Sequence, residues 1–501
     1  MSSDAWRHNL RSMRWRCWRS FGAALLLCGC TVGPDFRRPE PPESTSYTRS
    51  SVELPGAGPA DAKQILVGGT TVVGKWWELF RSPSLDDVVT LALAGSPSLD
   101  AARASLAQAQ AVIAEARGAL YPQVDVGAGA ARLRSEGSGV QGPAPAVGNV
   151  LSVGPTVSYG PDVFGGTRRL IEQQSALAEV QRDELAAAYL SLTGNAVTQA
   201  INIGSAREQI EAVREIVAID ERNLELVLIE QEIGKAAQID VLNARSVLAS
   251  DQALLPPIRQ QLSVARHALS ILAGKPPATW SPPDFELSAL SLPTELPVRL
   301  PSDLVKERPD ILAAEAQMHA ATAAIGVATA HLYPSITLSA SWTQQSGSMG
   351  TLFEGSSGLW GVAAQLTAPV FHGGTLQAQR AAAESALVVQ LALYRETVLQ
   401  AFGQVADTLR ALEHDAEAIA AQQNALEAAQ ASLELAQESY AAGQSSFLQV
   451  LEVQRLYQQA RLGYAKARGQ RYLDSVQLFM AMGGAARAWS DPALGASSPR
   501  S

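Results

Sequence analysis

The period of the apolar pattern changes abruptly in the middle of the chain. Pro301-Ser302-Asp303 and Arg308-Pro309-Asp310 each supply a helix start, because proline suits the first turn and aspartate suits the positive N-terminal end. The Ala-rich stretch that follows predicts a helix to about Leu332, which Pro334 ends because a residue before proline is pushed out of the α region. From Ser335 on, apolar residues alternate with small polar ones, which predicts a strand with one apolar face.

The same succession of helix, proline stop and strand occurs twice. Leu120-Tyr121-Pro122 in the first half corresponds to Leu332-Tyr333-Pro334 in the second. Three later landmarks recur at a constant spacing: Gly234 with Gly443, Val241-Leu242 with Val450-Leu451, and Gly274 with Gly483. Because the order of landmarks is kept, we interpret the chain as a duplication of one module, which consists of a helix, a hairpin and two long helices.

The alternation predicts two strands in each copy, at about 123–134 and 150–160, then at about 335–345 and 359–370. Strands of about ten residues joined by Gly-rich loops are typical of a transmembrane β-barrel, although two soluble hairpins would show the same periodicity. The smallest membrane barrels have about eight strands, and an open edge in lipid leaves backbone groups unpaired. If these strands span a membrane, the barrel must therefore be shared among several chains.

Each hairpin leads into a long proline-free stretch, 167–230 in the first copy and 375–442 in the second. At about 1.5 Å per residue, about 65 residues make a helix roughly 100 Å long. The second stretch carries a seven-residue apolar repeat typical of a coiled coil, at Leu391, Val398, Val405, Leu412, Ile419, Leu426, Leu433 and Tyr440. Towards Gly443, the positions four residues after Ile419, Leu426 and Leu433 are the polar residues Gln423, Gln430 and Gln437. We therefore expect that end of the helix to pack less tightly or to face water.

A second helix returns from each long helix, at 238–273 and at 447–482, and Pro256-Pro257 must break the first of them. The predicted organisation is a signal peptide, an extended tether, a first repeat, a linker, a second repeat and an irregular tail. Their ranges are 1–29, 30–73, 74–274, 275–299, 300–484 and 485–501.

The first residues resemble a bacterial lipoprotein signal. Five arginines precede a short apolar run, 21–27, which is far below the length of a transmembrane helix. Leu27-Cys28-Gly29-Cys30 then resembles a lipobox with Cys30 as the lipidated first residue, and an ordinary signal peptide with incidental cysteines is the alternative. The Pro-, Ser- and Gly-rich residues 30–73 predict a tether without a packed core of its own. No other stretch approaches eighteen uninterrupted apolar residues, so we expect no membrane-spanning helix.

Composition narrows the function further. Removal of residues 1–29, with their five arginines and one aspartate, takes the formal net charge from −9 to −13, which disfavours nucleic acid as a partner. All 3 cysteines lie in the first thirty residues, which excludes a disulfide framework. The 6 histidines show no metal-ligand spacing, so we expect no metal and no cofactor beyond the covalent lipid. Residues 69–75 resemble a phosphate-binding loop, but Trp76 stands where the Mg²⁺-binding hydroxyl residue should be. An enzyme is therefore the function that we favour least.

In combination, five motifs resemble the TolC-like outer membrane factor family, in its OprM/NodT lipoprotein branch. They are Cys30-Thr31-Val32-Gly33-Pro34-Asp35-Phe36, Trp76-Trp77, Leu300-Pro301-Ser302-Asp303-Leu304 with Arg308-Pro309-Asp310, Pro369-Val370-Phe371-His372-Gly373-Gly374, and Tyr440-Ala441-Ala442-Gly443. The resemblance covers nearly the whole mature chain. It implies an α+β membrane protein, a homotrimer with a twelve-stranded outer-membrane β-barrel, four strands per chain, and a periplasmic barrel of long helices.

The resemblance also implies a function and partners. The family forms the outer-membrane exit duct of tripartite, RND-type efflux systems, which passively conducts drugs or other small molecules outward. A periplasmic adaptor, an inner-membrane transporter and the outer-membrane lipid are the implied partners. The alternative is a lipid-anchored periplasmic coiled-coil scaffold without a pore, and conductance across a planar bilayer separates the two.

In that family the duct closes at the helix turns furthest from the membrane. Carried over residue by residue, the resemblance implies a constriction that is formed by Asp240, Tyr440, Gln449 and Glu452. Gln449 departs from the usual Asp, so one ring of charge is lost or moved, and Ser445 stands where some members have a gating Arg. The alternative for the two carboxylates is that they are solvated helix-start residues.

The two helix turns are the expected docking sites. They join the long helices and lack lateral helix neighbours, so we expect Gly234, Lys235, Gly443 and Gln444 to contact the adaptor. In a narrow trimeric tube, three copies of each constriction carboxylate would attract cations and repel anions.

Overall fold

The structure is a computed structural model that describes residues 31–40, 44–50, 52, 54, 64–69, 74–135 and 146–484. The predicted signal peptide, the predicted lipidation site Cys30 and the tail after 484 lie outside the described residues. The chain divides into two compact units. Unit 1 contains residues up to 39, 106–180 and 314–394, and unit 2 contains 40–105, 181–313 and the residues from 395 on.

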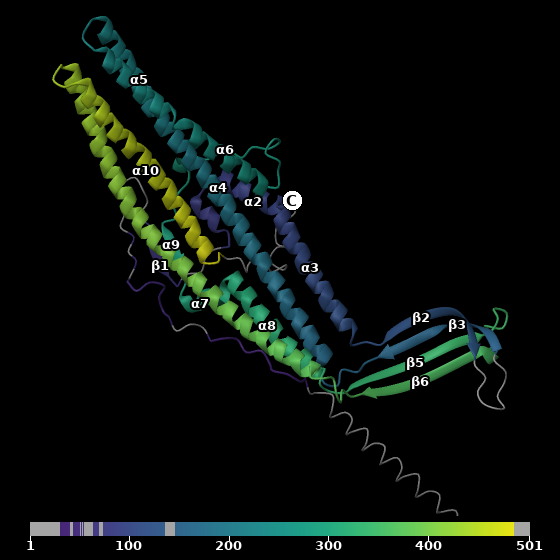
Figure 1. The fold of residues 1–501 in the computed structure, drawn as a ribbon. Coiled ribbons are helices and arrows are strands. Elements are labelled where there is room, and N and C mark those ends of the chain that lie inside the picture. The colour runs from purple at the N-terminus through teal and green to yellow at the C-terminus, as the bar shows by residue number, and fades with distance from the viewer. Residues whose placement is uncertain are drawn as a thin grey trace, which may run out of the picture. The chain divides into compact units, whose positions relative to one another are not determined.

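The elements follow one another in the same order in both halves of the chain (Figure 1). The first copy consists of α3 (Pro97–Gly118), β2 (Gln123–Ser135), β3 (Ala146–Tyr159), α4 (Gly166–Glu232), α5 (Gln238–Gln252) and α6 (Leu255–Leu272). The second consists of α8 (Pro309–Ala330), β5 (Ser335–Ser346), β6 (Gly358–Thr367), α9 (Thr375–Ala441) and α10 (Phe447–Ala481). The predicted duplication is therefore present. Short helices precede each copy: η1 (Trp76–Phe80) and α2 (Pro83–Gly95), then η2 (Leu287–Ala289) and α7 (Pro301–Glu307), while η3 (Gly355–Ser357) precedes β6.

Unit 1 contains one antiparallel sheet with the strand order β2-β3-β5-β6. β3 begins at Ala146, four residues before the predicted start, because Leu133, Arg134 and Ser135 extend the ladder opposite it. β6 ends at Thr367, three residues before the predicted end, and Pro369 just beyond it has no amide hydrogen to give to a ladder.

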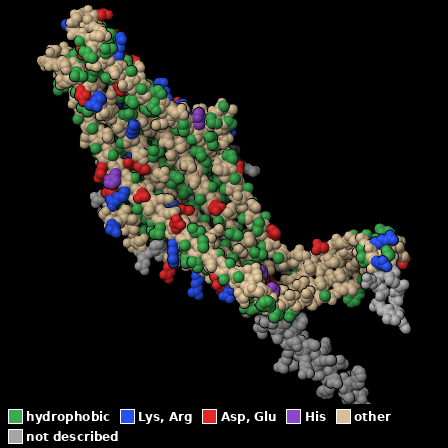
Figure 2. Space-filling view, viewed as in Figure 1, with side chains coloured by type: hydrophobic (Ala, Val, Ile, Leu, Met, Phe, Trp, Pro, Cys, Tyr) green, Lys and Arg blue, Asp and Glu red, His purple; other side chains and the backbone are tan. Residues whose placement is uncertain are grey.

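The register gives this sheet two chemically different faces. Cross-strand pairs on one face are apolar: Val124 with Val157, Val126 with Pro155, Ile336 with Leu366, Ala340 with Val362, and Trp342 with Trp360. The opposite face carries Gly127, Thr156, Thr337, Ser341, Gln365 and other small or polar residues. In the view of Figure 2, charged side chains are sparse along the strands. The sheet therefore has one face suited to lipid and one suited to water.

Glycines end the helices at equivalent places in the two copies. Gly234 has a φ of 78° and Gly443 has a φ of 74°, which is the left-handed region that glycine tolerates best. The same backbone bond closes both turns: the next residue's N–H reaches back to the carbonyl of Glu230 at 2.7 Å in the first copy and of Ser439 at 2.8 Å in the second. This is the Schellman pattern, in which a glycine satisfies the last carbonyls of a helix.

Most of the seven-residue apolar repeat of α9 is buried, while Leu391, Leu426 and Tyr440 are half-buried. Val398, Val405, Leu412, Ile419 and Leu433 are all buried, with at most 6% of their surface exposed. Of the three glutamines that predicted looser packing towards Gly443, Gln430 and Gln437 are exposed and Gln423 is half-buried. The seam therefore loosens near the turn.

The N-terminal segment is extended, but it makes more contacts than a free tether would. β1 (Ile65–Gly68) pairs in parallel with β4 (Glu295–Val298), within the predicted linker. The Tyr47 hydroxyl donates to the Arg299 carbonyl at 2.9 Å, and its ring meets Phe402 edge-on. Trp76, which is 1% exposed, stacks on Phe479. Composition predicted the extension, but it did not predict the docking, which depends on partners far away in the sequence.

One helix of the described chain, α8, is long and apolar enough to cross a membrane by length and composition. Half of its apolar window is buried inside the protein, as in a core helix.

Candidate functional site

The two turns of unit 2 carry the residues that the sequence predicted to contact an adaptor. Gly234 and Lys235 between α4 and α5, and Gly443 and Gln444 between α9 and α10, are exposed. Large apolar side chains beside them are also exposed: Ile233 by 62%, Ile239 by 59% and Leu448 by 64%. Both turns thus present glycine-capped loops with apolar flanks.

Tyr440 joins the two helical hairpins. Its hydroxyl donates a hydrogen bond to the carboxylate of Glu230, in the last turn of α4. Its ring lies 5.6 Å from the ring of Phe447, which is 5% exposed. Burial, followed by the hydrogen bond to Glu230, raises the pKa of Tyr440, so the hydroxyl stays protonated and able to donate.

An apolar cluster lies directly behind this bond. It consists of Val227 of α4, Val241 and Ala244 of α5, and Phe447 and Leu451 of α10, all buried. Burial of such side chains stabilises by about 25 cal/mol per Å² of apolar surface. The ends of the two hairpins are therefore held together by both packing and a charge-assisted hydrogen bond.

The predicted constriction residues differ in their surroundings. Asp240 is half-buried, and its carboxylate accepts the Ala237 N–H at 3.1 Å, which caps α5. Gln449 is exposed in the first turn of α10, where the Ser446 hydroxyl caps its N–H. Glu452 is exposed and pairs with Arg455 at 2.5 Å, and this hydrogen bond lowers the pKa of Glu452. The Glu452 carboxylate thus has a compensating charge on its own helix, whereas the bond that Asp240 makes is to a neutral backbone group.

Further from the turns, each hairpin carries a pair of aspartates between its two helices. Asp220 of α4, 3% exposed, lies beside Asp251 of α5, and burial, followed by the neighbouring Asp251, raises the pKa of Asp220 to about 8. Gln454 and Gln458 of α10 donate to Asp220 and Asp251 respectively. Neutral amides suit a pair of carboxyl groups that shares one proton.

The second hairpin has a corresponding pair at a different height. Asp415 of α9 lies beside Asp474 of α10, and burial, followed by the neighbouring Asp474, raises the pKa of Asp415 to about 8. The Arg471 guanidinium, which is buried, opposes that shift. Each hairpin therefore has a buried aspartate with a raised pKa beside a second aspartate on its other helix.

Sequence reasoning missed Glu230, Arg455 and the aspartate pairs. The Glu452–Arg455 spacing was readable as a helical ion pair, because side chains three positions apart share a helix face. Glu230 lies just before Gly234, as Tyr440 lies just before Gly443, which marks both as last-turn residues. The aspartate pairs left no signal, because the members of each pair lie on different helices and share no local spacing. Among the described residues, no group of three or more His, Cys, Asp or Glu could hold a metal ion.

Comparison with known proteins identifies the family. The outer membrane efflux protein family matches residues 88–275 and 300–484, one segment in each copy. The chain is 32% identical over 471 residues to the pyoverdine export outer membrane protein OpmQ of Pseudomonas aeruginosa, covering 92% of this chain and 95% of that protein. It is 30% identical over 482 residues to the toluene efflux pump outer membrane protein TtgF of Pseudomonas putida, covering 93% and 96%.

Solved structures agree with the sequence relatives. The outer-membrane channel OprN superposes with a TM-score of 0.82 at 26% identity, covering 91% of this chain and all of that one. The open state of the MtrE outer membrane channel of Neisseria gonorrhoeae gives 0.77 at 25% identity, covering 91% and 99%.

The duplicated helical hairpins and the one-sided apolar sheet define an outer-membrane channel fold of the TolC-like class. The chain belongs to the outer membrane efflux protein family, a family of transport proteins. It is an outer-membrane component of an efflux pump.

Proposed function

We propose that this chain is the exit duct of a tripartite, RND-type efflux system and works as a homotrimer with a twelve-stranded barrel. The observation that carries this proposal is the open sheet. Among the described strands, β2 and β6 each have one partner, so each has a free edge. A free edge in lipid leaves backbone groups unpaired at several kcal/mol each. Pairing β6 of one copy with β2 of the next removes every edge, and three copies give twelve strands.

The two faces of the sheet support the same assembly. A closed barrel places the apolar pairs, such as Trp342 with Trp360, towards lipid, and the small polar face, such as Thr337 and Gln365, towards a water-filled lumen. A scaffold without a pore has no use for this division. The duct conducts small molecules, and a periplasmic adaptor together with an inner-membrane transporter delivers them.

The remaining parts of the function rest on the turns and on the N-terminus. We assign the adaptor contact to Gly234, Lys235, Gly443 and Gln444, and the closed constriction to Asp240, Tyr440, Gln449 and Glu452. The bond from Tyr440 to Glu230 supports a closed state that can be released. The lipobox-like sequence supports acylation of Cys30, which palmitate labelling of the wild type, but not of Cys30→Ser, would establish.

A cross-linking experiment tests the shared barrel. One cysteine is placed at the free edge of β2, at Gly127, and a second is scanned along β6 from Trp360 to Gln365. We expect oxidised membranes to give bands of two and three chains and none larger, because a closed trimer has three such seams. A matched cysteine pair across β3 and β5, which are already partners within one chain, should give no multimer. A ladder beyond three, or a stable monomer with full sheet content and no bilayer conductance, contradicts the proposal.

A further inference from the structure

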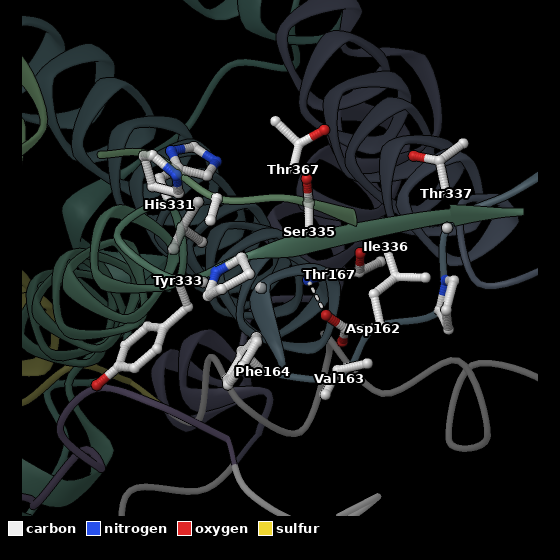
Figure 3. A pocket seen from close by; sticks show the side chains of 18 of the residues that line it. Asp162, Val163, Phe164, Thr167, His331, Tyr333, Ser335, Ile336, Thr337 and Thr367 are labelled. Carbon is white, nitrogen blue, oxygen red and sulfur yellow. Dashed lines mark hydrogen bonds between the residues drawn. The ribbon is translucent and has the colours of Figure 1, made fainter. Parts of the chain in front are cut away.

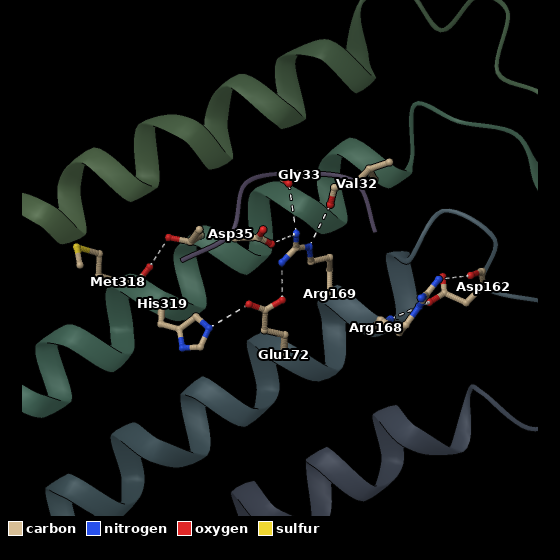
Figure 4. Close-up of polar contacts among 10 residues, drawn as sticks. Val32, Gly33, Asp35, Asp162, Arg168, Arg169, Glu172, Met318 and His319 are labelled. Atoms are coloured by element: carbon tan, nitrogen blue, oxygen red, sulfur yellow. Dashed lines mark hydrogen bonds and ion pairs between the residues drawn. The ribbon is translucent and has the colours of Figure 1, made fainter. Parts of the chain in front are cut away.

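Residues Thr31–Arg38, called here the N-terminal strap, lie against α4 and α8 of unit 1 (Figure 4). The centre of this contact is Arg169 of α4, which is 4% exposed. Its guanidinium donates to the Val32 carbonyl at 3.1 Å and the Gly33 carbonyl at 3.3 Å, and it pairs with Asp35 at 2.7 Å. Without the strap, most donors of this buried cation would lack partners, which is costly.

The contact surface is shaped to admit a backbone. Gly33 has a φ of 94°, and a Cβ there would lie 2.4 Å from Cα of Gly326 on α8. A Cβ on Gly326 would in turn lie 2.7 Å from the Arg169 side chain, and one on Gly165 would lie 2.6 Å from the Thr31 methyl. Three glycines, one on the strap and two on its receptor, thus allow contacts that no other residue would allow without a shift.

The far end of the strap is held by side chains of α8. The Phe36 ring stacks on the His319 ring, with centroids 4.5 Å apart and planes 18° apart. His319 bonds to Glu172 of α4 at 3.0 Å, and Glu172 also pairs with Arg169 at 2.7 Å. Arg38 pairs with Glu315 at 2.8 Å. The strap and both helices therefore form one connected polar network with an aromatic stack at its end.

The near end of the strap reaches the junction of strands and helices. The Val32 N–H donates to the Phe164 carbonyl at 3.1 Å, between the end of β3 and the start of α4. The Phe164 ring stacks on Tyr333, 4.8 Å away, and both line a cavity of about 590 Å³ at the foot of the sheet (Figure 3). Thr31 is therefore fixed beside Gly165, at the start of α4.

We propose that this surface of α4 and α8 is a receptor site for the chain's own N-terminus, which fixes the lipid attachment point at the foot of the sheet. The position of the anchor rests on the proposed acylation of Cys30. Cys30 is one Cα step, about 3.8 Å, from the docked Thr31. A free tether of about 40 residues would instead let its end wander over roughly 35 Å. Docking therefore delivers the acyl chains to the lipid beside the sheet, and Arg169 acts as the positioning residue.

Limited trypsin digestion of the purified full-length protein tests the docking. The strap contains one susceptible bond, Arg37–Arg38, because trypsin does not cut before Pro39. Cleavage of a docked segment follows the population of its undocked form. We expect Arg169→Ala to speed cleavage at this bond about tenfold or more, which corresponds to about 1.4 kcal/mol of lost docking free energy. Arg168→Ala is the matched control, since the Arg168 side chain bonds to Asp162 and not to the strap.

A second pair of variants keeps the test decisive if Arg169→Ala does not fold. Phe36→Ala and Gly33→Ala alter the strap alone, and both should also speed cleavage at Arg37–Arg38. Cleavage at the wild-type rate in these two variants would overturn the receptor site. Mass measurement of the released N-terminal peptide reports acylation separately. An unmodified Cys30 with protected Arg37 would remove the lipid anchor and leave the docking, whereas an acylated Cys30 with unprotected Arg37 would do the reverse.

Discussion

The turns of the two helical hairpins are alike, but the helices that return from these turns differ. In the second, α10 runs unbroken for 35 residues. In the first, the return is split into α5 and α6 at Ala253-Leu254, just before Pro256-Pro257. When the two glycine turns are aligned, Pro256 corresponds to Ala465, which is buried in the middle of α10. The turns stayed alike because both need a glycine with positive φ, and nothing comparable constrains the returning helix.

The break changes how the first hairpin packs. Ile258, just after the prolines, is buried against Ala206, Ile210 and Val213 of α4. In the second hairpin, α10 is uninterrupted and its Ala465 and Gly469 are buried. A Cβ on Gly469 would meet the side chain of Ser205, on α4 of the first hairpin, at 2.3 Å. The comparison shows that one returning helix packs by bending at a proline, while its duplicate stays straight and packs through small residues.

Exchanging proline and alanine between the two returning helices should have the largest effect on stability. Ala465→Pro removes a helical hydrogen bond and makes the ring clash with the preceding turn, which costs about 3 kcal/mol or more. Pro256→Ala should change stability by less than about 1 kcal/mol, because the helix is already interrupted there and the site is a first-turn position. Thermal unfolding followed by circular dichroism measures both. Equal losses of stability in the two variants would mean that Pro256 and Ala465 do not occupy the corresponding positions that the alignment of the turns assigns to them.

Raising the pH should weaken both hairpins through their aspartate pairs. An ordinary aspartate has a pKa of about 4, and burial raises the pKa of Asp220 to about 8. The folded state therefore binds this proton more tightly than the unfolded state. The stabilisation is complete below about pH 4 and falls by up to about 1.4 kcal/mol per pH unit until the pH passes about 8.

Neutral variants should remove this slope one hairpin at a time. Asp220→Asn removes the titration of the first pair, and Asp415→Asn, whose pKa burial also raises to about 8, removes that of the second. Urea unfolding between about pH 5 and about pH 9 should show a smaller slope in each variant and the smallest in the double variant. Asp87→Asn, an exposed carboxylate of α2, is the control. A wild-type slope in both aspartate variants would show that the pairs do not share a proton.

The bond between the two hairpins should affect gating more than stability. Tyr440→Phe keeps the ring against Phe447 and removes the hydroxyl that donates to Glu230. A hydrogen bond to a charged group contributes about 1.5–3 kcal/mol, enough to shift a closed–open equilibrium at least tenfold. We expect a larger open fraction in bilayer recordings, and Glu230→Gln should give a similar increase. If the two changes were fully additive in the double variant, the residues would not act through one bond.

Much of the architecture could be predicted from local patterns. Alternation over Ser335–Trp342 predicted a strand with one apolar face, and the proline-free stretches predicted the long helices, because period and proline are local signals. The docking of the strap at Arg169 could not be predicted in this way. Pro, Gly and Ser are equally frequent in free tethers, and the strap's partners, such as Arg169 and His319, lie far along the chain in helices of both copies.

The candidate site shows the same limit. Resemblance placed Tyr440 beside the turn, but the spacing of residues within α9 does not say which side chain of α4 faces it. β1 and β4 were missed because each is only four residues long, too short to show a period, and the two lie on opposite sides of the whole first repeat in the sequence. Long-range pairing is set by tertiary packing, which overrides short-range propensity.

The smallest effect on stability should come from the constriction carboxylates, where the two hairpins again differ. We predict a cation-selective mouth lined by Asp240 and Glu452, since rings of carboxylates concentrate cations. Glu452 is paired with Arg455, so its field is partly cancelled, whereas Asp240 is bonded to a neutral backbone N–H. Asp240→Asn should therefore lower the cation-over-anion permeability more than Glu452→Gln, and Arg455→Gln should raise it. Reversal potentials across a salt gradient measure all three. Unfolding temperatures should change little, because Glu452 and Arg455 are exposed and an asparagine at 240 keeps an oxygen that can accept the Ala237 N–H. Unchanged selectivity and unchanged block by trivalent cations in the Asp240→Asn, Glu452→Gln double variant would mean that these carboxylates are solvated helix-start residues outside the constriction.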